Sequence, residues 1–428
     1  MLEFFLVVPI LWGLFRNKLP IVFLFIVILY KTNWFFGTST SELFFYHNLY
    51  DVGLFFIIVL TIKLLKRKGN NGIDVKVIKK GFFFFVMFFL LCSFVDLLVN
   101  HTPLVSQIKA AKNYVPLILL SVVNKITKDE AIRFFKLLIL TTTIFSALFV
   151  FEQLSGLSIT GAAHTAGGSR CPLPWPLALL CFALLISGKY VVSKKIRLLF
   201  FIALLANVVL CGSRSFFLSY VFVFSLFILL SKPSLKKAFA VILGIVAILL
   251  IFSTDNILSR RFNDSKSDMQ SLQANTGEVE GNFSFRVLLM NERLEYVANS
   301  WQYSIFGIGN IEEKNFKKEI FFIGHMDESG KVYQVDTGDI AWAIAFLRWG
   351  ILGTLIYVLL PYRRFIIYTF RNRKSPYAQA IFLYLSANLF LISWTYSDIV
   401  TMDFWVVPIV LLPISCLVLE NRKQKSYA

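Results

Sequence analysis

Long apolar runs alternate with short polar connections along most of this chain. A helix needs about 20 apolar residues to cross the roughly 30 Å of hydrocarbon in a bilayer. The runs predict about 12–13 transmembrane helices, and the first two are short enough to form a hairpin or one broken helix. The predicted spans lie near residues 2–15, 19–30, 50–64, 81–97, 103–123, 133–154, 173–188, 196–211, 215–231, 237–253, 336–360, 377–396 and 401–419.

The apolar pattern is interrupted once, between Ser253 and Asp336. Such a long connection is usually functional or disordered. It divides the chain into N-terminal transmembrane helices (1–253), one large loop (254–335), and C-terminal transmembrane helices with a tail (336–428).

The second half of the large loop has a helical pattern. Apolar residues recur there at near-helical spacing, which predicts an amphipathic helix that rests on the bundle or on the membrane surface. A glycine turn at Gly307 and Gly309 is expected to end this helix. The apolar positions are Val287, Met290, Leu294, Val297, Trp301 and Ile305.

Composition excludes a soluble protein. Of 428 residues, 57% are hydrophobic and only 16% are charged, so the fold class is an all-α polytopic integral membrane protein. The net charge of +18 does not indicate nucleic-acid binding, because the cations lie in short connections between apolar runs. About 28 of the 43 Lys and Arg residues fall in alternate connections and the tail, which places these and the C-terminus in the cytoplasm and the large loop outside.

Nothing in the sequence predicts a cofactor. The five cysteines lie mostly in or beside apolar runs and form neither a disulfide framework nor a metal-ligand pattern. No glycine-rich nucleotide cradle is evident. We therefore expect no metal and no cofactor.

Two arginines of the large loop are spaced to share one helix face. Arg286 and Arg293 differ by about 20° in direction and about 10 Å in height on a helix. Two guanidinium groups on one face suit a diphosphate, since each makes paired hydrogen bonds to phosphate oxygens. The alternative is that both arginines pair with neighbouring glutamates or with solvent.

Four further cations lie close to apolar runs. Arg214 occupies a turn of a few residues between two spans, where a charge is costly and is usually functional. Arg348 lies near the middle of span 336–360, so it needs a partner or a water-filled cavity. Lys109 and Lys112 share one face of span 103–123, and they either contact an anionic headgroup or extend to the interface.

Acidic and imidazole groups of the outer connections are candidate general bases. Asp339, with Asp336, opens a span at its outer end, where it either caps the helix or takes a proton from a sugar hydroxyl. His325 and His164 are rival bases, because an imidazole titrates near neutral pH.

Taken together, these features resemble the O-antigen ligase/polymerase superfamily. The resemblance rests on about a dozen spans, one large outer loop before the last three, the stretch from Arg286 to Gly309, the Gly-Ser-Arg turn at 212–214, and Gly350 with Gly353. Ligases of this group carry His, then Asn, Ser or Gln, nine residues, Gly, two residues, and Gly, Thr or Tyr. Asp339 stands where their histidine would be, so the chain is most similar to a Wzy-type polymerase.

The resemblance implies a metal-independent glycosyltransferase of the GT-C kind, of inverting type. Its site would lie at the outer face of a bacterial cytoplasmic (inner) membrane, with donor and acceptor glycans carried on undecaprenyl diphosphate. Arg170, Arg214, Arg286 and Arg293 would stabilise the diphosphate, and Asp339 or His325 would act as the base. Trp301, Tyr296 and Tyr303 would stack on sugar rings. A chain-length regulator and a flippase would be partners in assembling surface polysaccharide, and nucleic acid would not.

Three other functions stay open. The first is a cell-wall polymerase of the RodA/FtsW type, which has a similar gross topology but whose motif pattern is not seen in the sequence. A ligase or protein O-glycosylation transferase would use the same donor with a lipid A core or a protein as acceptor. A flippase for lipid-linked oligosaccharide would line a central cavity with Lys109, Lys112 and Arg348. No two-half symmetry of the kind many transporters show is visible in the sequence.

Overall fold

In the computed structural model the chain is described over residues 2–31, 35, 43–44, 47–69, 75–99, 101–157, 159, 174, 176–188, 193–211, 213–231, 234–235, 242, 244, 246, 253, 260, 282–309, 311, 321, 325–326, 332–335 and 339–415.

The chain before the large loop is built almost entirely of helices, with one very short strand pair, β1 (Leu43–Phe44) with β2 (His47–Asn48). In order, the helices are α1 (Leu2–Phe15), α2 (Leu19–Tyr30), α4 (Leu49–Leu65), α5 (Lys76–Val99), α6 (Leu104–Ala111), η1 (Lys112–Ile118), α7 (Leu119–Val122), η2 (Val123–Lys125), α8 (Lys128–Ser155), α9 (Leu177–Ser187), α10 (Lys194–Cys211) and α11 (Arg214–Leu230).

The large loop contributes two helices and a second short strand pair, β3 (His325–Met326) with β4 (Val332–Tyr333). The loop helices are α14 (Asn282–Ala298) and α15 (Trp301–Phe306). After the loop come α16 (Ala341–Tyr357), η4 (Val358–Tyr362), α17 (Arg363–Arg371), α18 (Pro376–Phe390), η5 (Ile392–Trp394), η6 (Asp398–Val400), η7 (Met402–Trp405), α19 (Val406–Leu411) and η8 (Leu412–Ile414).

Length and apolarity identify this as a polytopic membrane protein. Within the described residues, four helical stretches are long and apolar enough to cross a membrane, and shorter apolar helices accompany them. The long ones are Lys76–Val99, Lys128–Ser155, Ala341–Arg371 and Pro376–Trp394. Large apolar side chains of α5, such as Phe83 and Phe94, point out of the bundle, as lipid-facing residues do. The predicted all-α class is confirmed, apart from the two-residue strands.

The N-terminal pair forms a hairpin, one of the two arrangements that the sequence left open. α1 and α2 are about 21 Å and 18 Å long, which is shorter than the hydrocarbon layer. They are joined by a turn in which Asn17 has a positive φ of 55°. Val22 of α2 would contact any Cβ added at Gly13 of α1, so the hairpin depends on a close approach of the two helices.

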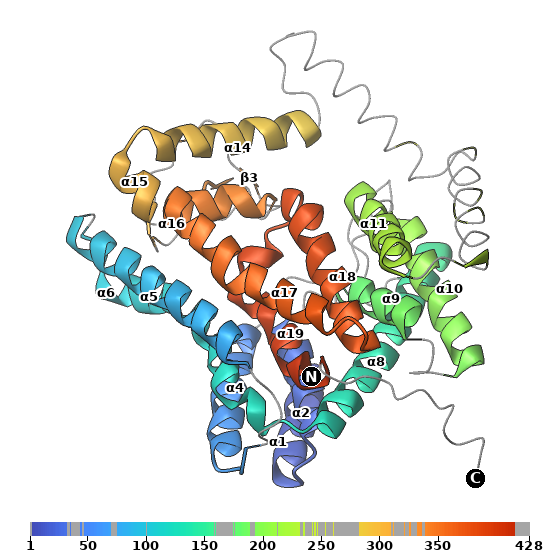
Figure 1. Cartoon of the computed structure of the whole chain (residues 1–428). Coiled ribbons are helices and arrows are strands. Elements are labelled where there is room, and N and C mark those ends of the chain that lie inside the picture. Colours follow the sequence, from blue (N-terminus) through green and yellow to red (C-terminus); the bar gives the residue numbers. More distant parts are fainter. Residues whose placement is uncertain are drawn as a thin grey trace.

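Helix α16, which kinks at Gly350, and its continuation lie at the centre of the C-terminal part. The helical stretch runs from Ala341 to Arg371, past the end of the predicted span 336–360. α14 lies across the end of the bundle at which α16 begins, and α15 turns back toward α16 (Figure 1). We call this end the loop side, and the opposite end, where α17 finishes, the basic side.

Two other predicted elements differ from the structure. The expected single loop helix is broken at Asn299 and Ser300, and the Ser300 hydroxyl caps α15 by accepting a hydrogen bond from the Tyr303 N–H at 3.5 Å. The predicted span 103–123 is interrupted, because the 3₁₀ turn η1 with Pro116 inside it follows α6. The predicted span 237–253 falls largely outside the described residues.

Candidate functional site

The structure brings together two of the predicted site residues, from opposite ends of the large loop. Arg286 Nη2 lies 3.3 Å from Asp339 Oδ1, and both side chains are about three-quarters buried, with exposed fractions of 23% and 24%. Arg286 belongs to the first turns of α14, and Asp339 lies two residues before the start of α16. A predicted phosphate-binding cation and a predicted base are therefore direct neighbours on the loop side.

The contact with Asp339 leaves most of the Arg286 guanidinium unused. Arginine has five N–H donors in a planar fork. The Nε atom of Arg286 is buried and has no hydrogen-bond partner among the described residues. A buried donor without an acceptor is costly, and an incoming phosphate oxygen would satisfy it.

The packing of α14 explains why Arg286 is held in this place. Leu289 is fully buried against Ile340, Trp342 and Ala343 at the start of α16. This small core presses the N-terminal half of α14 onto the residues that follow Asp339. Burial of a leucine side chain contributes about 1.5–3 kcal/mol, so the contact fixes the two elements at the pair.

Arg293 has a different environment from Arg286. Its exposed fraction is 1%, its Nη1 lies 2.7 Å from Glu292 Oε2, and its Nη2 donates to the Gln334 carbonyl at 3.0 Å. Its guanidinium carbon also lies 4.3 Å from the centre of the Phe321 ring. In this conformation Arg293 ties α14 to later parts of the loop and is not open to a ligand.

The buried stripe of α14 also differs from the one read from the sequence. Leu289, Arg293 and Val297 are the buried positions at four-residue spacing, whereas Val287 is exposed. A charged residue occupies the middle of the inner face because the loop supplies it with partners, which a hydrophobicity pattern cannot reveal.

Arg214 lies where the sequence placed it, at the turn between two apolar helices. α10 ends at Cys211, Ser213 is the N-cap of α11, and Arg214 is the first residue of α11. The side chain is half-buried. The Ser213 and Ser215 hydroxyls lie 3.3 Å apart beside it, so the turn is polar.

The three aromatic residues predicted to hold sugars fall into two groups. Tyr296 and Tyr303 stack on each other with ring centres 5.4 Å apart and planes at 17°, and Tyr296 also contacts Phe321. Burial, and next the neighbouring Tyr303, raise the pKa of Tyr296 to about 12, so this hydroxyl stays protonated at neutral pH. Trp301 is 69% exposed and offers a free ring face.

The predicted glycines form a joint between the loop and α16. Gly307, Gly309 and Gly350 all have positive φ, at 66°, 75° and 69°. Because α16 breaks at Gly350, the carbonyls of Leu347 and Arg348 accept from the N–H groups of Ile308 and Gly309, at 2.8 and 3.2 Å.

No side chain fits at this joint. A Cβ at Gly307 would lie 2.5 Å from the Arg348 carbonyl oxygen, and one at Gly350 would lie 2.7 Å from the Tyr303 carbonyl oxygen. Gly353, one turn further along α16, lies against the Phe88 ring of α5. The motif therefore positions the loop on the bundle.

The other three cations predicted near apolar runs, besides Arg214, differ in their surroundings. Arg348 is in the second turn of α16 and its Nη1 donates to the Ile311 carbonyl at 3.4 Å, so its expected partner comes from the loop. Lys112 Nζ lies 2.9 Å from Asp51 Oδ1, and both side chains are less than half exposed. Lys109 is exposed on α6.

Four other predicted residues are described only in part or lie outside the described residues. His325 lies in β3 and pairs in register with Tyr333, and the position of its side chain is not described. Arg170 lies outside the described residues, as do His164 and Asp336. Among the described residues no group of His, Cys, Asp and Glu could hold a metal ion.

Sequence reasoning missed Asp96, a buried carboxylate near the joint. It is 2% exposed near the loop-side end of α5, accepts a hydrogen bond from Gln107 of α6, and has Gly309 packed against its Cβ. A single acid in the apolar run 81–97 was the available signal, since ionisable residues within spans are usually functional.

A second polar cluster was also missed. Lys31, at the end of α2, forms ion pairs with Asp403 and, at 3.9 Å, with Asp398. Nearby, Tyr30 donates to the Tyr50 hydroxyl at 2.8 Å. Lys31 and Asp398 lie between predicted spans, and the other three residues lie near the ends of predicted spans, so only packing reveals that they meet.

One comparison with known proteins finds a family match over part of the chain. The family model described as O-antigen ligase matches residues 199–358. The matched segment contains Arg214, Arg286, Asp339 and the glycine joint. No curated protein gives a significant match. The family match supports the O-antigen ligase/polymerase superfamily, and with it a membrane enzyme that transfers glycans in the assembly of surface polysaccharide.

Proposed function

We propose that this protein polymerises undecaprenyl-diphosphate-linked oligosaccharide repeat units at the outer face of a bacterial cytoplasmic membrane. The observation that carries the proposal is the 3.3 Å contact between Arg286 and Asp339. This contact supports the proposal because, in the proposed reaction, Arg286 would bind the leaving diphosphate and Asp339 would accept the proton of the attacking hydroxyl.

In the proposed reaction a sugar hydroxyl of the acceptor attacks the anomeric carbon of the donor glycan. The new carbon–oxygen bond forms as the bond to the lipid diphosphate breaks, and the bonding electrons leave with the diphosphate. The hydroxyl proton passes to the Asp339 carboxylate. Attack from the face opposite the leaving group inverts the anomeric centre.

Arg286 has two roles in this scheme. Before the donor binds, it neutralises Asp339 in a site that is largely shielded from water. When the diphosphate arrives, the unused Nε–H and remaining N–H groups bind its oxygens and stabilise the charge that accumulates there. Arg214, half-buried at its turn, is a second candidate for the diphosphate, and Trp301 is the candidate for stacking on a sugar ring.

Arg293 acts differently in this proposal. Its burial and three partners make it a positioning residue that holds α14 on the loop, and thereby holds Arg286 beside Asp339.

Ligase activity is a second candidate, because the matching family model is described as O-antigen ligase. The same donor chemistry would serve, with a lipid A core or a protein in place of the growing glycan. Asp339 in the position of the ligase histidine favours polymerase.

The glycan profile of a deletion strain tests the proposal. We expect the final acceptor molecule at the cell surface to carry only a single repeat unit. Long chains that remain on the undecaprenyl carrier would establish the ligase instead, and single units retained on the cytoplasmic face would establish a flippase. Complementation with Asp339→Asn should fail although the protein is present in the membrane, whereas normal extension by that variant would leave Asp339 only as an ion-pair partner of Arg286; the N-cap of α16 is Ile340, without a side-chain cap.

A further inference from the structure

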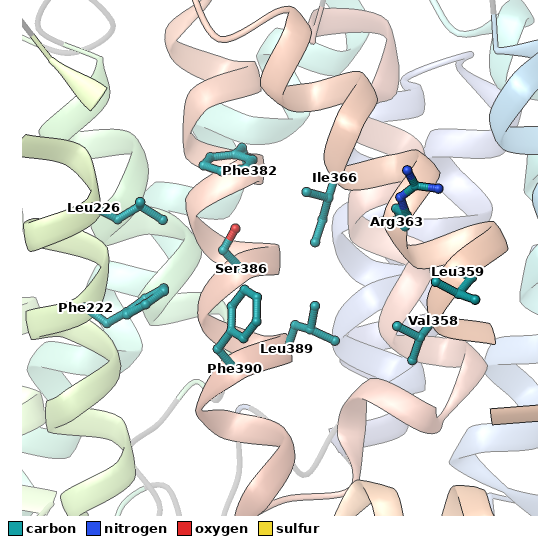
Figure 2. Close-up of a pocket in the computed structure, with 10 residues that line it drawn as sticks. All are labelled: Phe222, Leu226, Val358, Leu359, Arg363, Ile366, Phe382, Ser386, Leu389 and Phe390. Atoms are coloured by element: carbon teal, nitrogen blue, oxygen red, sulfur yellow. The ribbon is translucent and has the colours of Figure 1, made fainter. Parts of the chain in front are cut away.

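The basic side of the bundle contains an apolar groove that the glycan chemistry does not use. It has a volume of about 510 Å³ and is open along one side. Side chains of α11, of the stretch from η4 into α17, and of α18 line it, among them Phe222, Leu226, Ile366 and Phe390 (Figure 2).

The groove contains one charged side chain, Arg363. Figure 2 shows its guanidinium away from the end that Leu389 and Phe390 form. Arg363 is exposed, and its side chain makes no hydrogen bond or ion pair with any described residue. Its neighbour Arg364, by contrast, donates to the Val77 carbonyl at 3.3 Å.

Distance separates this cation from the proposed active site. Asp339 lies before α16 on the loop side, and α16 kinks at Gly350. Arg363 follows this kink by 13 residues, which is about 20 Å along the helical stretch toward the basic side.

The dimensions of the groove match one leaflet. Val358 and Ile366 on one wall, like Phe382 and Phe390 on the other, are eight residues apart, so the groove is about 12 Å long. Half of the roughly 30 Å hydrocarbon layer is about 15 Å. An acyl chain of one leaflet would lie along the groove.

The surrounding charge selects the headgroup. Between Val358 and Lys374 the chain has five cations and no Asp or Glu, namely Arg363, Arg364, Arg371, Arg373 and Lys374. Basic pockets between transmembrane helices on the cytoplasmic side bind anionic phospholipid headgroups.

We infer that this groove is a binding site for an anionic diacyl phospholipid, with an acyl chain between α11 and α18 and the phosphate on Arg363. The inference does not depend on the proposed glycan transfer. It assigns a partner to a guanidinium that has none among the described residues.

Native mass spectrometry of the purified full-length protein tests the inference. The probes are phosphatidylglycerol and phosphatidylcholine with identical acyl chains, in competition. We expect a preference for phosphatidylglycerol that falls about fivefold in Arg363→Ala, because one cation near the surface contributes about that factor.

Two further variants separate the groove from general electrostatics. Arg371→Ala removes the same charge from the same helix outside the groove and should keep the preference. Leu226→Trp fills the groove from α11 and keeps Arg363. This variant should lose the preference for phosphatidylglycerol. Equal losses in Arg363→Ala and Arg371→Ala would overturn the inference, as would an unchanged preference in Leu226→Trp or tighter binding of a polyprenyl phosphate than of phosphatidylglycerol.

Discussion

Arg286 and Arg293 show how two identical side chains on one helix acquire different roles. They are seven residues apart on α14, yet Arg293 is 1% exposed with partners on several sides, and Arg286 keeps a buried Nε without one among the described residues. The hydrogen-bond donors of Arg293 have partners within the protein, whereas the Nε donor of Arg286 has none among the described residues. Substitutions of the two arginines should therefore have different consequences.

Replacement of Arg286 should affect transfer more than folding. We expect Arg286→Ala to lower the rate of glycan extension by about 10²–10³-fold, the usual cost of removing one donor to a developing negative charge. Arg286→Lys should recover little, because it lacks the planar fork. The measurement is extension of a lipid-linked donor by purified protein.

Arg67 provides the matched control for Arg286. Arg67 Nη1 lies 2.8 Å from Glu130 Oε1, with exposed fractions of 29% and 19%, so it forms an ion pair of similar exposure on the basic side. Arg67→Ala should extend glycans normally. Equal losses of extension activity in Arg67→Ala and Arg286→Ala would show that removal of any such ion pair impairs the protein, and that Arg286 has no specific role in transfer.

Replacement of Arg293 should affect folding of the loop. Removal of one partner of a buried charged pair costs about 3–5 kcal/mol, so Arg293→Gln should lower the thermal unfolding temperature and expose the segment around Asn299 to protease. Arg293→Lys should be intermediate. A fully stable Arg293→Gln protein that cannot extend glycans would instead place Arg293 in contact with substrate.

Among the helices, the joint between α15 and α16 decides where the loop lies. The break at Gly350 frees two carbonyls of α16, and Ile308 and Gly309 of the loop donate to them. Backbone hydrogen bonds across the joint explain how an otherwise polar loop is fixed on a membrane bundle.

Gly350 and Gly156 form a matched pair for testing the joint. Both have positive φ, but a Cβ at Gly350 meets backbone atoms within 2.8 Å, whereas a Cβ at Gly156 meets nothing within 4 Å. Gly156→Ala should cost only the backbone strain, about 1–2 kcal/mol. Gly350→Ala should unfold at a clearly lower temperature and lose activity, and equal unfolding temperatures would show that the joint tolerates a side chain.

Across the molecule as a whole, charge distribution predicts orientation. In the described part of the chain, basic residues lie where α4 ends, where α5 and α8 begin and where α17 ends, away from α14 of the large loop (Figure 1), as the positive-inside rule requires if the loop faces outward. α16 and α17 connect these two ends directly, from Asp339 to Arg371.

Cysteine labelling tests the orientation. In a background with Cys171→Ser and Cys416→Ser, the remaining cysteines Cys92, Cys181 and Cys211 are buried. Asn299→Cys should react with a membrane-impermeant maleimide in intact spheroplasts. Arg373→Cys should react only after lysis, and the reverse pattern would place the large loop in the cytoplasm.

Much of this protein could be predicted from its sequence because a membrane imposes simple rules. Lipid requires continuous apolar helices, so the ends of α1, α2, α4 and α11 agree with the predicted spans to within one residue. Glycines at fixed spacing and arginines near the loop were also visible, since positive φ and charge near hydrocarbon limit the choice of residue.

The pairing of distant residues required the folded chain. Arg286 with Asp339, Lys31 with Asp403, and Asp96 with Gly309 each join segments far apart in sequence. Local patterns report which face of a helix is apolar, but partners for a buried charge are supplied by other elements. Arg293 therefore looked like a ligand-binding residue in the sequence and lies buried in the structure, while Arg286 keeps a free Nε because packing brought only Asp339 to it among the described residues.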